Sequence, residues 1–344
     1  MKKFKFGNLF KDSFTTLATV AILCLFLSPL LYMVFTSLKT KEQMTAQGSP
    51  IWPAQPATFT YQGTVLDMYN VPTDQGIKAL ALFKKGRTES QFIDPANLNA
   101  QPYTFAGSYR SLDRPWAFSP SWDNYSKAWN TINFPRLFFN TLALAFISLV
   151  GTIASCILVA YGFARFRIPG KNFLFTLLIS TIFLPAAVTL VPTYTFFVKI
   201  GWVGTWLPLL VPTFFANAYD VFLFRQYFLT IPREMDEAAM MDGAGPFRIL
   251  MSIILPQSIP VIVAVSIFHI VWSWNDFFAP MIYLSTREDL QPIAVGLNRF
   301  NGIHSTQPQL VQAAAMMTLL VPVLIFLIGQ RAFMRGVVIT GVEK

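Results

Sequence analysis

The chain has 344 residues, of which 54% are hydrophobic and 12% are charged, and its mean hydropathy is +0.49. Ordinary soluble domains carry about 25% charged residues, so this composition excludes a soluble globular protein and indicates an integral membrane protein. The net charge of +9 could suggest nucleic acid as a partner. However, the basic residues flank apolar segments and form no run with interleaved aromatic residues, so we expect no nucleic-acid binding.

Six apolar segments are long enough to cross a bilayer, for which a helix needs about 20 residues. The first exceeds the apolar core of about 7–15 residues found in signal peptides, so we expect it to be retained. The fourth contains Pro208 and Pro212 and should be kinked. The predicted spans are Leu17–Phe35, Phe138–Gly162, Phe173–Val198, Trp206–Phe224, Ile259–Leu284 and Leu310–Phe333. We therefore predict an all-α integral membrane protein with six transmembrane helices.

A long loop between the first two spans departs from this helical plan. Within it, Thr64–Val71 and Ile77–Lys84 have the composition of strands, and the turn-forming segment 72–76 joins them, which predicts a hairpin. Further strands are predicted at Thr88–Ile93 and Gln101–Phe105. We expect a small β-rich insertion outside the cytoplasm. The predicted organisation is an amino-terminus and first helix at 1–38, the loop at 39–136 and a transmembrane core at 137–344.

Basic residues predict the orientation, because short cytoplasmic loops carry an excess of lysine and arginine. The short loops on the other face hold only Lys199, Arg287 and Arg299. Long loops cross the membrane regardless of charge, so the first loop is not counted. The basic residues on the predicted cytoplasmic face are Lys2, Lys3, Lys5, Lys11, Arg165, Arg167, Lys171, Arg225, Arg233, Arg248, Arg331, Arg335 and Lys344. Both termini are therefore predicted to be cytoplasmic.

The most charged short segment, 231–256, lies between the fourth and fifth predicted spans. Pro232 suits the first turn of a helix, and the acidic residues that follow favour the positive end of the helix dipole. A narrow apolar stripe at helical spacing could enter a partner's groove; it consists of Met235, Ala238 and Ala239. Gly243 can form a left-handed cap, and Pro246 can restart a second short helix. The pattern predicts a bent helix–turn–helix outside the membrane.

This segment carries a family resemblance. The pattern Glu237-Ala-Ala-x3-Gly243-x9-Ile253-x-Leu255-Pro256 is similar to the EAA loop of bacterial ABC importer permeases. In that family the loop is the coupling helix, which docks into a cleft on the cytoplasmic ATPase subunit. A lone Glu-Ala-Ala would leave an amphipathic loop without a partner as the better interpretation, but the full pattern favours docking. The resemblance implies a coupling loop at 225–258, with docking residues Glu234, Met235, Glu237, Ala238, Ala239, Asp242, Gly243 and Pro246.

Other stretches resemble the carbohydrate-uptake branch of these permeases, in particular the smaller permease subunit of maltose-type transporters. They are Asn124-Tyr125, Phe139-Asn140-Thr141, Ala160-Tyr-Gly-Phe-Ala-Arg-Phe166 continuing to Gly170, Trp272-Ser-Trp-Asn-Asp276 with Pro280, Gly296-Leu297, and Gln330-Arg331-Ala-Phe333 with Arg335-Gly336. The resemblance implies a type I ABC importer fold in a prokaryotic plasma membrane. It also implies as partners a second permease subunit forming a heterodimer, two ATP-binding subunits and an extracytoplasmic solute-binding protein, with a sugar as substrate. By the same analogy the outward loop at 285–309 would meet the binding protein.

Several kinds of chemistry are not expected. Gly170-Lys171 has neither the preceding glycine nor the hydroxyl residue of a nucleotide-binding loop, so the chain should not hydrolyse ATP. Cys24 and Cys156 lie within apolar runs, which favours neither a disulfide framework nor a metal site. His269 and His304 are isolated, and we interpret the membrane histidine as a packing residue. We therefore expect no enzyme activity, no cofactor and no metal.

Polar residues in or near the spans mark the candidate substrate path. A carboxylate in hydrocarbon costs several kcal/mol, so Asp220 and Asp276 should face water, a partner or the protein interior. Asn275 is either a hydrogen-bonding group on a sugar path or a helix-end cap. Trp272 and Trp274 could stack on a sugar ring or anchor the helix at the membrane interface. We take Asn275, Trp272 and Trp274 as the path candidates.

Three alternatives to a sugar importer stay open at this point. The same architecture could move another polar solute, such as a glycerol-phosphate-like compound, which basic residues along the path would support. An ion-gradient-driven transporter would need buried acidic or histidine relays and usually an internal repeat. A membrane-embedded enzyme would need a clustered catalytic set.

Overall fold

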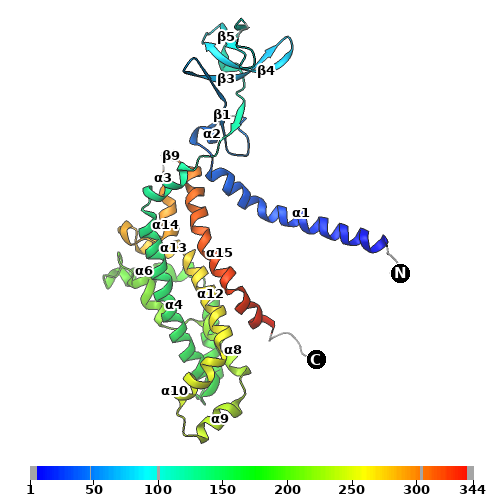
Figure 1. Ribbon diagram of the computed structural model, residues 1–344. Coiled ribbons are helices and arrows are strands. Elements are labelled where there is room, and N and C mark those ends of the chain that lie inside the picture. Colours follow the sequence, from blue (N-terminus) through cyan, green and yellow to red (C-terminus); the bar gives the residue numbers. More distant parts are fainter. Residues whose placement is uncertain (1–5, 47, 99–100, 303–304, 339–344) are drawn as a thin grey trace. The chain divides into compact units, whose positions relative to one another are not determined.

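The computed structural model describes residues 6–46, 48–98, 101–302 and 305–338 (Figure 1). His304 and the tail beyond Val338, which entered the sequence predictions, lie outside the described residues. The chain divides into two compact units, which are Met1–Ala128 with Ile303–Met316 and Trp129–Gly302 with Met317–Lys344.

The first unit contains a five-stranded antiparallel sheet with the strand order β2-β3-β4-β5-β6. Its strands are β2 (Thr58–Tyr61), β3 (Thr64–Thr73), β4 (Gly76–Lys84), β5 (Glu89–Ile93) and β6 (Tyr103–Ala106). The predicted hairpin is β3–β4, and the two further predicted strands correspond to β5 and β6. The sequence analysis missed β2, although the Gln62-Gly63 turn that joins it to β3 has the positive φ angles, 48° and 80°, of a tight hairpin turn.

Aromatic and aliphatic side chains form the core of this sheet. The buried members are Tyr69, Val71, Leu80, Leu82 and Phe92, and Tyr103, Phe105 and Tyr109 pack against them. Phe83 is instead half exposed and lies edge-on to Tyr61. Arg114 stabilises the rim by pairing with Asp67 at 2.6 Å and by lying over the ring of Tyr69. The aromatic residues of this segment therefore serve mainly to pack the sheet.

The rest of the first unit consists of helices, short strands and a turn outside the five-stranded sheet. Its elements are α1 (Phe6–Ser37), α2 (Lys41–Thr45), the paired short strands β1 (Ala54–Pro56) and β7 (Trp116–Phe118), a 3₁₀ turn (Tyr109–Ser111) and the start of α3 (Asp123–Thr131). The buried Asn124 amide donates hydrogen bonds to the carbonyls of Ser37 and Lys39 at 2.8 and 2.7 Å. Asn124 thus fixes the end of α1, which gives a structural role to one residue of the family pattern.

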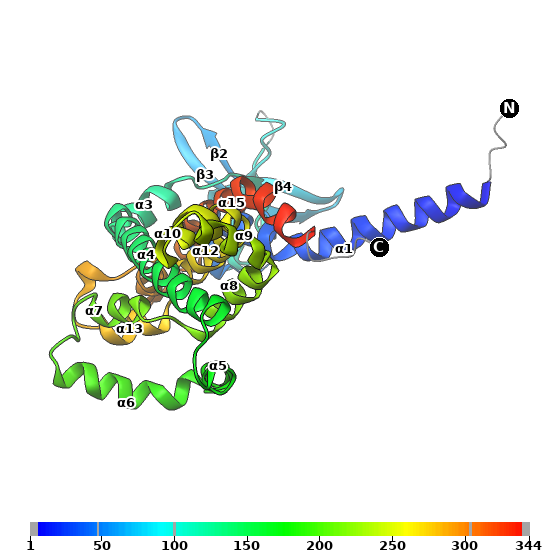
Figure 2. The ribbon, with the colours of Figure 1, turned by 90° about the horizontal axis from the view of Figure 1, so that it is seen from below.

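The second unit is a helical bundle centred on α4 (Phe134–Arg165). Helices α8 (Ala218–Thr230) and α12 (Ile259–Trp274) pack against α4, as the view in Figure 2 shows. At the close contact beside α4, a Cβ at Gly151 would lie 2.8 Å from the ring of Phe214. The other helices of this unit are α5 (Lys171–Ser180), α6 (Ala186–Lys199), α7 (Leu207–Leu210), α9 (Arg233–Met241), α10 (Pro246–Ile249), α11 (Leu255–Gln257), α13 (Phe278–Tyr283) and α14 (Ile293–Gly296). The unit also contains the short strand β8 (Asn301–Gly302), 3₁₀ turns at Thr181–Phe183, Val211–Phe214, Glu288–Leu290 and Leu297–Phe300, and a π turn at Leu250–Ile254. Helix α15 (Pro308–Val338) belongs to this unit from Met317 onward, whereas its first residues and β9 (Ser305–Thr306) belong to the first unit.

Four helical segments of the described chain have the length and apolar composition to cross a membrane. They are Ser13–Ser37, Phe134–Arg165, Leu207–Thr230 and Pro308–Gln330. Two bent helix pairs raise the number to six if each pair counts as one span; they are Lys171–Phe183 with Ala187–Lys199, bent by 96°, and Pro246–Gln257 with Ile259–Trp274, bent by 76°.

Two predicted spans are therefore not single helices. The third, Phe173–Val198, breaks at Leu184, which adopts an extended conformation because the following Pro185 disfavours helical geometry in its predecessor. The fifth, Ile259–Leu284, ends as a helix at Trp274 and resumes at α13. A continuous helix would bring the ring of Pro280 against the carbonyl four residues earlier. The kink predicted in the fourth span is present between Val211 and Asn217, where α7 and α8 are separated.

Candidate coupling site and membrane cavity

The segment after α8 forms the predicted bent helix–turn–helix. Helix α9 begins after Pro232, carries Glu234 and Asp236 in its first turn, and ends at Met241. Gly243 has a φ of +77°, so the left-handed cap that the sequence predicts is present. Pro246 then starts α10, as expected, and the chain continues through the π turn into α11 and α12.

A buried ion pair fixes the inner face of α9 to the end of α4. Nε of Arg165 lies 2.7 Å from Oδ2 of Asp236, and their side chains are 7% and 10% exposed. Arg165 also donates a hydrogen bond to the carbonyl of Ile231 at 2.9 Å, and the hydroxyl of Tyr161 donates to the carbonyl of Pro246 at 3.0 Å. Burial raises the pKa of the Asp236 carboxyl above its ordinary value, and the charge of Arg165 only partly opposes this shift.

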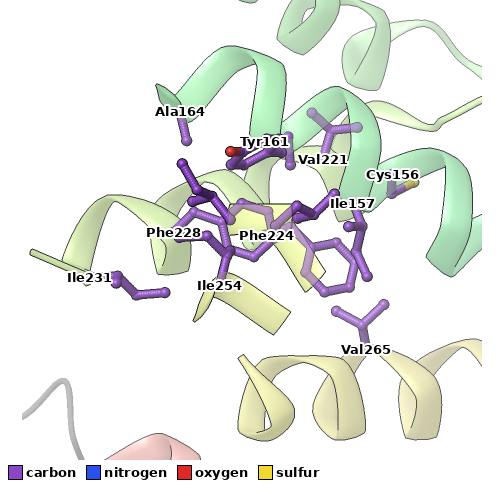
Figure 3. Close-up of a cluster of buried hydrophobic side chains, with 13 residues drawn as sticks. Cys156, Ile157, Tyr161, Ala164, Val221, Phe224, Phe228, Ile231, Ile254 and Val265 are labelled. Carbon is purple, nitrogen blue, oxygen red and sulfur yellow. The ribbon is translucent and has the colours of Figure 1, made fainter. Parts of the chain in front are cut away.

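An apolar cluster continues the attachment on both sides of α9 (Figure 3). Ile231 before the helix and Ile249, Leu250 and Ile254 after it are at most 5% exposed. They share this cluster with side chains of three bundle helices, namely Cys156, Ile157, Ala160, Tyr161 and Ala164 of α4, Val221, Phe224 and Phe228 of α8, and Val265 of α12. The coupling segment is therefore continuous with the core of the bundle, so motion of one can be transmitted to the other.

The outer face of α9 is left exposed by the described residues of this chain. Met235 is 41% and Met241 is 88% exposed. Met241 was not among the predicted docking residues. Besides Met235, the predicted docking residues that are exposed are Glu234, Glu237, Ala238, Asp242, Gly243 and Pro246. Ala239 differs, since it packs against the apolar cluster, and the predicted stripe of Met235, Ala238 and Ala239 is corrected accordingly.

Sequence reasoning did not find the inward role of Asp236 or its pairing with Arg165. The spacing of Asp236 and Ala239, three positions apart, places both on one helical face, while Glu234 and Glu237 lie on the other side. That spacing was readable in the sequence. The identity of its cationic partner was not readable, because Arg165 lies 71 positions before Asp236 in the sequence. No local pattern singles out Arg165 from the other basic residues.

A cavity of about 230 Å³ lies within the bundle, where α4, α7, α12 and α13 meet. Its polar lining includes Thr141, Ser148, Thr213, Trp272, Ser273 and Asp276. Asp276 is the only charged residue among those that line it, and all of them are described. The cavity thus offers hydroxyl groups, one carboxylate and one indole, a set suited to a polyhydroxylated ligand.

The three predicted path residues are placed differently. Trp272 lines the cavity and is 68% exposed. Trp274 is 4% exposed and packs edge-on against Phe138, with ring centroids 5.7 Å apart, so it serves the core. The Asn275 amide donates to the carbonyl of Val271 at 2.7 Å, which is the helix-end cap that the sequence left open. Asp276, next to Asn275, is the charged residue that lines the cavity.

His269 is a hydrogen-bonded packing residue, as interpreted from the sequence. Its Nε2 lies 2.8 Å from the hydroxyl oxygen of Ser148, and its ring contacts Trp272. Among the described residues no three His, Cys, Asp or Glu side chains could jointly hold a metal ion.

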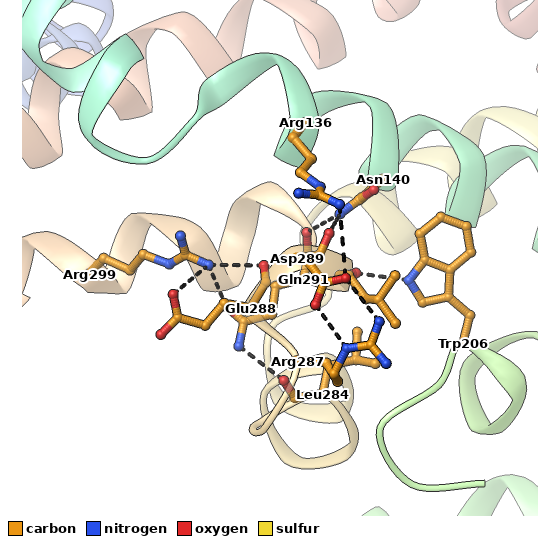
Figure 4. Close-up of polar contacts among 10 residues, drawn as sticks. Arg136, Asn140, Trp206, Leu284, Arg287, Glu288, Asp289, Gln291 and Arg299 are labelled. Carbon is orange, nitrogen blue, oxygen red and sulfur yellow. Dashed lines mark hydrogen bonds and ion pairs between the residues drawn. The ribbon is translucent and has the colours of Figure 1, made fainter.

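A polar network holds the loop after α13 against the opposite end of α4 (Figure 4). The Asn140 amide donates to the carbonyls of Asp289 and Gln291, both at 2.9 Å, and the Trp206 indole donates to the carbonyl of Leu290 at 2.8 Å. Arg287 pairs with Asp289 and lowers the pKa of that carboxyl to about 2. Asn140 belongs to the family pattern, and the network gives it a structural role.

Comparison with known proteins agrees with this architecture. Residues 148–338 match the family model described as a binding-protein-dependent transport system inner membrane component. The sn-glycerol-3-phosphate transport system permease protein UgpE of Pectobacterium atrosepticum is 33% identical over 63% of this chain and 79% of its own. The probable ABC transporter permease protein YurM of Bacillus subtilis is 30% identical over 68% of this chain and 78% of its own.

A solved structure extends the likeness in fold. The crystal structure of a bacterial ABC transporter involved in the import of the acidic polysaccharide alginate contains a chain that superposes with a TM-score of 0.68. The match covers 97% of this chain and 100% of that chain at 16% identity, so it concerns the fold alone.

The bundle, the EAA-type segment and these matches define a multi-pass membrane permease with the type I ABC importer fold. The chain belongs to the family of binding-protein-dependent transport system inner membrane components. It is accordingly a permease subunit of a binding-protein-dependent ABC importer, which is a transport component and not an enzyme.

Proposed function

We propose that this permease imports a sugar or oligosaccharide and receives the energy of ATP hydrolysis through the outer face of α9. The observation that carries the proposal is the two-faced construction of α9. Its outer face is exposed, whereas Asp236 and Ala239 bind its inner face to the bundle. Closure of two ATPase subunits would draw the docked helices together and shift the bundle between inward-open and outward-open arrangements.

Glu237→Lys tests the coupling. Glu237 is exposed on α9, so reversing its charge should leave membrane insertion and subunit pairing intact while separating ATP hydrolysis from uptake. Glu42→Lys, the same change at an exposed acid of α2, is the matched control and should transport normally. Normal coupled uptake by Glu237→Lys, or its failure to insert, would contradict the docking role.

We propose a neutral carbohydrate as the substrate because the bundle cavity contains a carboxylate and no cation among its described lining residues. An anionic solute would meet repulsion from Asp276 in a region of low dielectric constant. Trp272 supplies an aromatic face for a sugar ring. Related permeases named for glycerol 3-phosphate keep the second candidate open, namely a phosphorylated solute carried by the same architecture.

Uptake by the complete transporter with its binding protein in liposomes distinguishes these candidates. Neutral oligosaccharides should be accumulated and glycerol 3-phosphate should not. Asp276→Asn should weaken sugar uptake, because an amide is a poorer acceptor for sugar hydroxyls than a carboxylate. Accumulation of glycerol 3-phosphate in preference to every neutral sugar would refute the assignment.

We further propose six spans in the plasma membrane of a prokaryote: the four long helical segments, the bent pair Lys171–Phe183 with Ala187–Lys199, and a fifth span that starts at Ile259, after the coupling loop. The basic residues support cytoplasmic termini and a cytoplasmic coupling loop at 225–258. A cysteine at Ala244 should then react only with reagents that reach the cytoplasm, and one at Gly107 only from outside. Labelling of both positions from the same side would contradict this topology.

The five-stranded sheet is proposed to be an extracytoplasmic insertion that enlarges the docking surface for the solute-binding protein. A unit of about fifty residues with no disulfide is marginal alone, so it should rest on another surface. Replacing Thr64–Arg110 with a short Gly/Ser linker should weaken association with the binding protein while the complex with a second permease and two ATPases still assembles. Unchanged association would refute the role, and loss of assembly would indicate a structural brace instead.

A further inference from the structure

A second cavity lies at the surface where α4 ends and α5 begins. Its volume is about 400 Å³, and it is lined by Arg165, Phe166, Arg167, Ile168, Pro169, Lys171 and Arg233. The guanidinium of Arg165 is already paired with Asp236. Arg167, Lys171 and Arg233 form no ion pair with a carboxylate of the described residues. Three cations therefore line one hollow without an ion pair to a described carboxylate, and the nearby Asp236, which is in electrostatic range of Arg233, is already paired with Arg165.

Neighbouring groups increase the positive potential of this hollow. Lys171 lies within electrostatic range of both Arg225 and Arg233. Arg225 stacks over the ring of Phe175 at 4.1 Å, and its buried Nε has no hydrogen-bond partner in the described chain. Helix α5 also begins at Lys171 after Gly170, with no side-chain cap on its N-terminus. The positive end of the α5 dipole therefore lies at Lys171, beside the other cations of the hollow.

We propose that this basic pocket, formed by Arg167, Lys171 and Arg233, binds a phosphate group, and that an anionic phospholipid of the surrounding leaflet supplies it. The pocket lies where α4, which is long and apolar enough to cross a membrane, ends and the bent pair that begins with α5 starts. On the proposed topology this end of α4 faces the cytoplasm, where anionic headgroups attract basic residues. Phe166 and Ile168 are 43% and 36% exposed beside the cations, so an acyl chain could contact them while the phosphate contacts the basic groups. These apolar neighbours favour a lipid phosphate over a free phosphate ion.

The test uses the whole importer, with its partner permease and ATPase subunits, purified and exposed to mixed phosphatidylglycerol and phosphatidylcholine. Native mass spectrometry then counts the lipids of each kind that remain bound. The test variant is Arg167→Gln with Lys171→Gln, which leaves Arg233 and hence the coupling helix unchanged. Since each basic residue near an anionic surface contributes roughly fivefold to binding, retention of phosphatidylglycerol at one site should fall by about 25-fold.

Two controls decide the outcome. Arg248→Gln with Lys199→Gln removes the same charge from exposed positions outside the pocket and should retain the lipid. Size-exclusion chromatography checks that each variant still assembles. Equal phosphatidylglycerol retention by the test variant and the control, or no preference over phosphatidylcholine in the unaltered importer, would overturn the proposal. Titration with inorganic phosphate distinguishes the source: if it displaces no lipid yet is itself bound in an Arg167- and Lys171-dependent manner, the lipid assignment is wrong.

Discussion

The ion pair between Arg165 and Asp236 gives the sharpest test of how the coupling helix is attached. Asp236→Ala removes the carboxylate and leaves the Arg165 guanidinium, 7% exposed, without its counter-charge. Removing one partner of a buried ion pair costs about 3–5 kcal/mol. Because the pair joins α9 to α4, this cost should appear as local opening of the coupling segment and not as global unfolding.

Amide hydrogen exchange of residues 231–244 in the permease without bound ATPase subunits measures this opening, because the outer face of α9 is then exposed in every variant. A loss of about 3 kcal/mol corresponds to exchange faster by roughly two powers of ten. The neighbouring Glu237→Ala is the matched control, since Glu237 is an acid on the same helix that faces outward. A surface substitution of this kind should change the opening free energy by at most about 0.5 kcal/mol.

A double substitution separates the cost of an uncompensated charge from the value of the pair itself. Burial raises the pKa of Asp236 despite the nearby guanidinium, which means that desolvation outweighs their attraction. Apolar residues in both places, Arg165→Met with Asp236→Leu, should therefore restore much of the exchange protection that Asp236→Ala loses. If Asp236→Ala is as mild as Glu237→Ala, or if the double variant is no better protected than Asp236→Ala, the reasoning fails.

Three further predictions follow from particular contacts. Gly296→Ala should destabilise the fold by about 1–3 kcal/mol, because its new Cβ would overlap Cδ1 of the buried Leu137. Leu137→Ala should partly relieve this clash in a thermal-unfolding assay. Trp272→Ala should raise the KM for sugar uptake with little effect on stability, whereas Trp274→Ala should lower stability by about 3–5 kcal/mol, since only the second ring is buried. The raised pKa of Asp236 means that the folded state holds its proton more tightly than the unfolded state, so the protection of α9 should decline as pH rises through the interval above the ordinary aspartate pKa. Asp236→Asn should remove that slope in hydrogen exchange, and an unchanged slope would assign it to another group.

Composition, hydropathy and local motifs were sufficient for the class of protein and for the design of the coupling segment. Long apolar runs require a membrane, since no soluble fold can bury so many of them. Pro232 and Pro246 fix the backbone φ angle where a helix starts, and Gly243 adopts the left-handed cap. These effects extend over only a few neighbouring residues, so the bent helix–turn–helix could be predicted from the sequence. The β3–β4 hairpin is local in the same sense.

Only the tertiary structure decided which side of each helix faces inward and which distant groups meet. Asp236 and Glu237 are adjacent acids, yet one is buried against Arg165 and the other is exposed, because the end of α4 lies beside only one face of α9. Trp274 and Trp272 are likewise two positions apart and serve the core and the cavity. The basic pocket contains Arg167, which follows the end of α4, together with Arg233 of α9. Such pairings depend on long-range packing of helices, which local propensity and spacing do not encode.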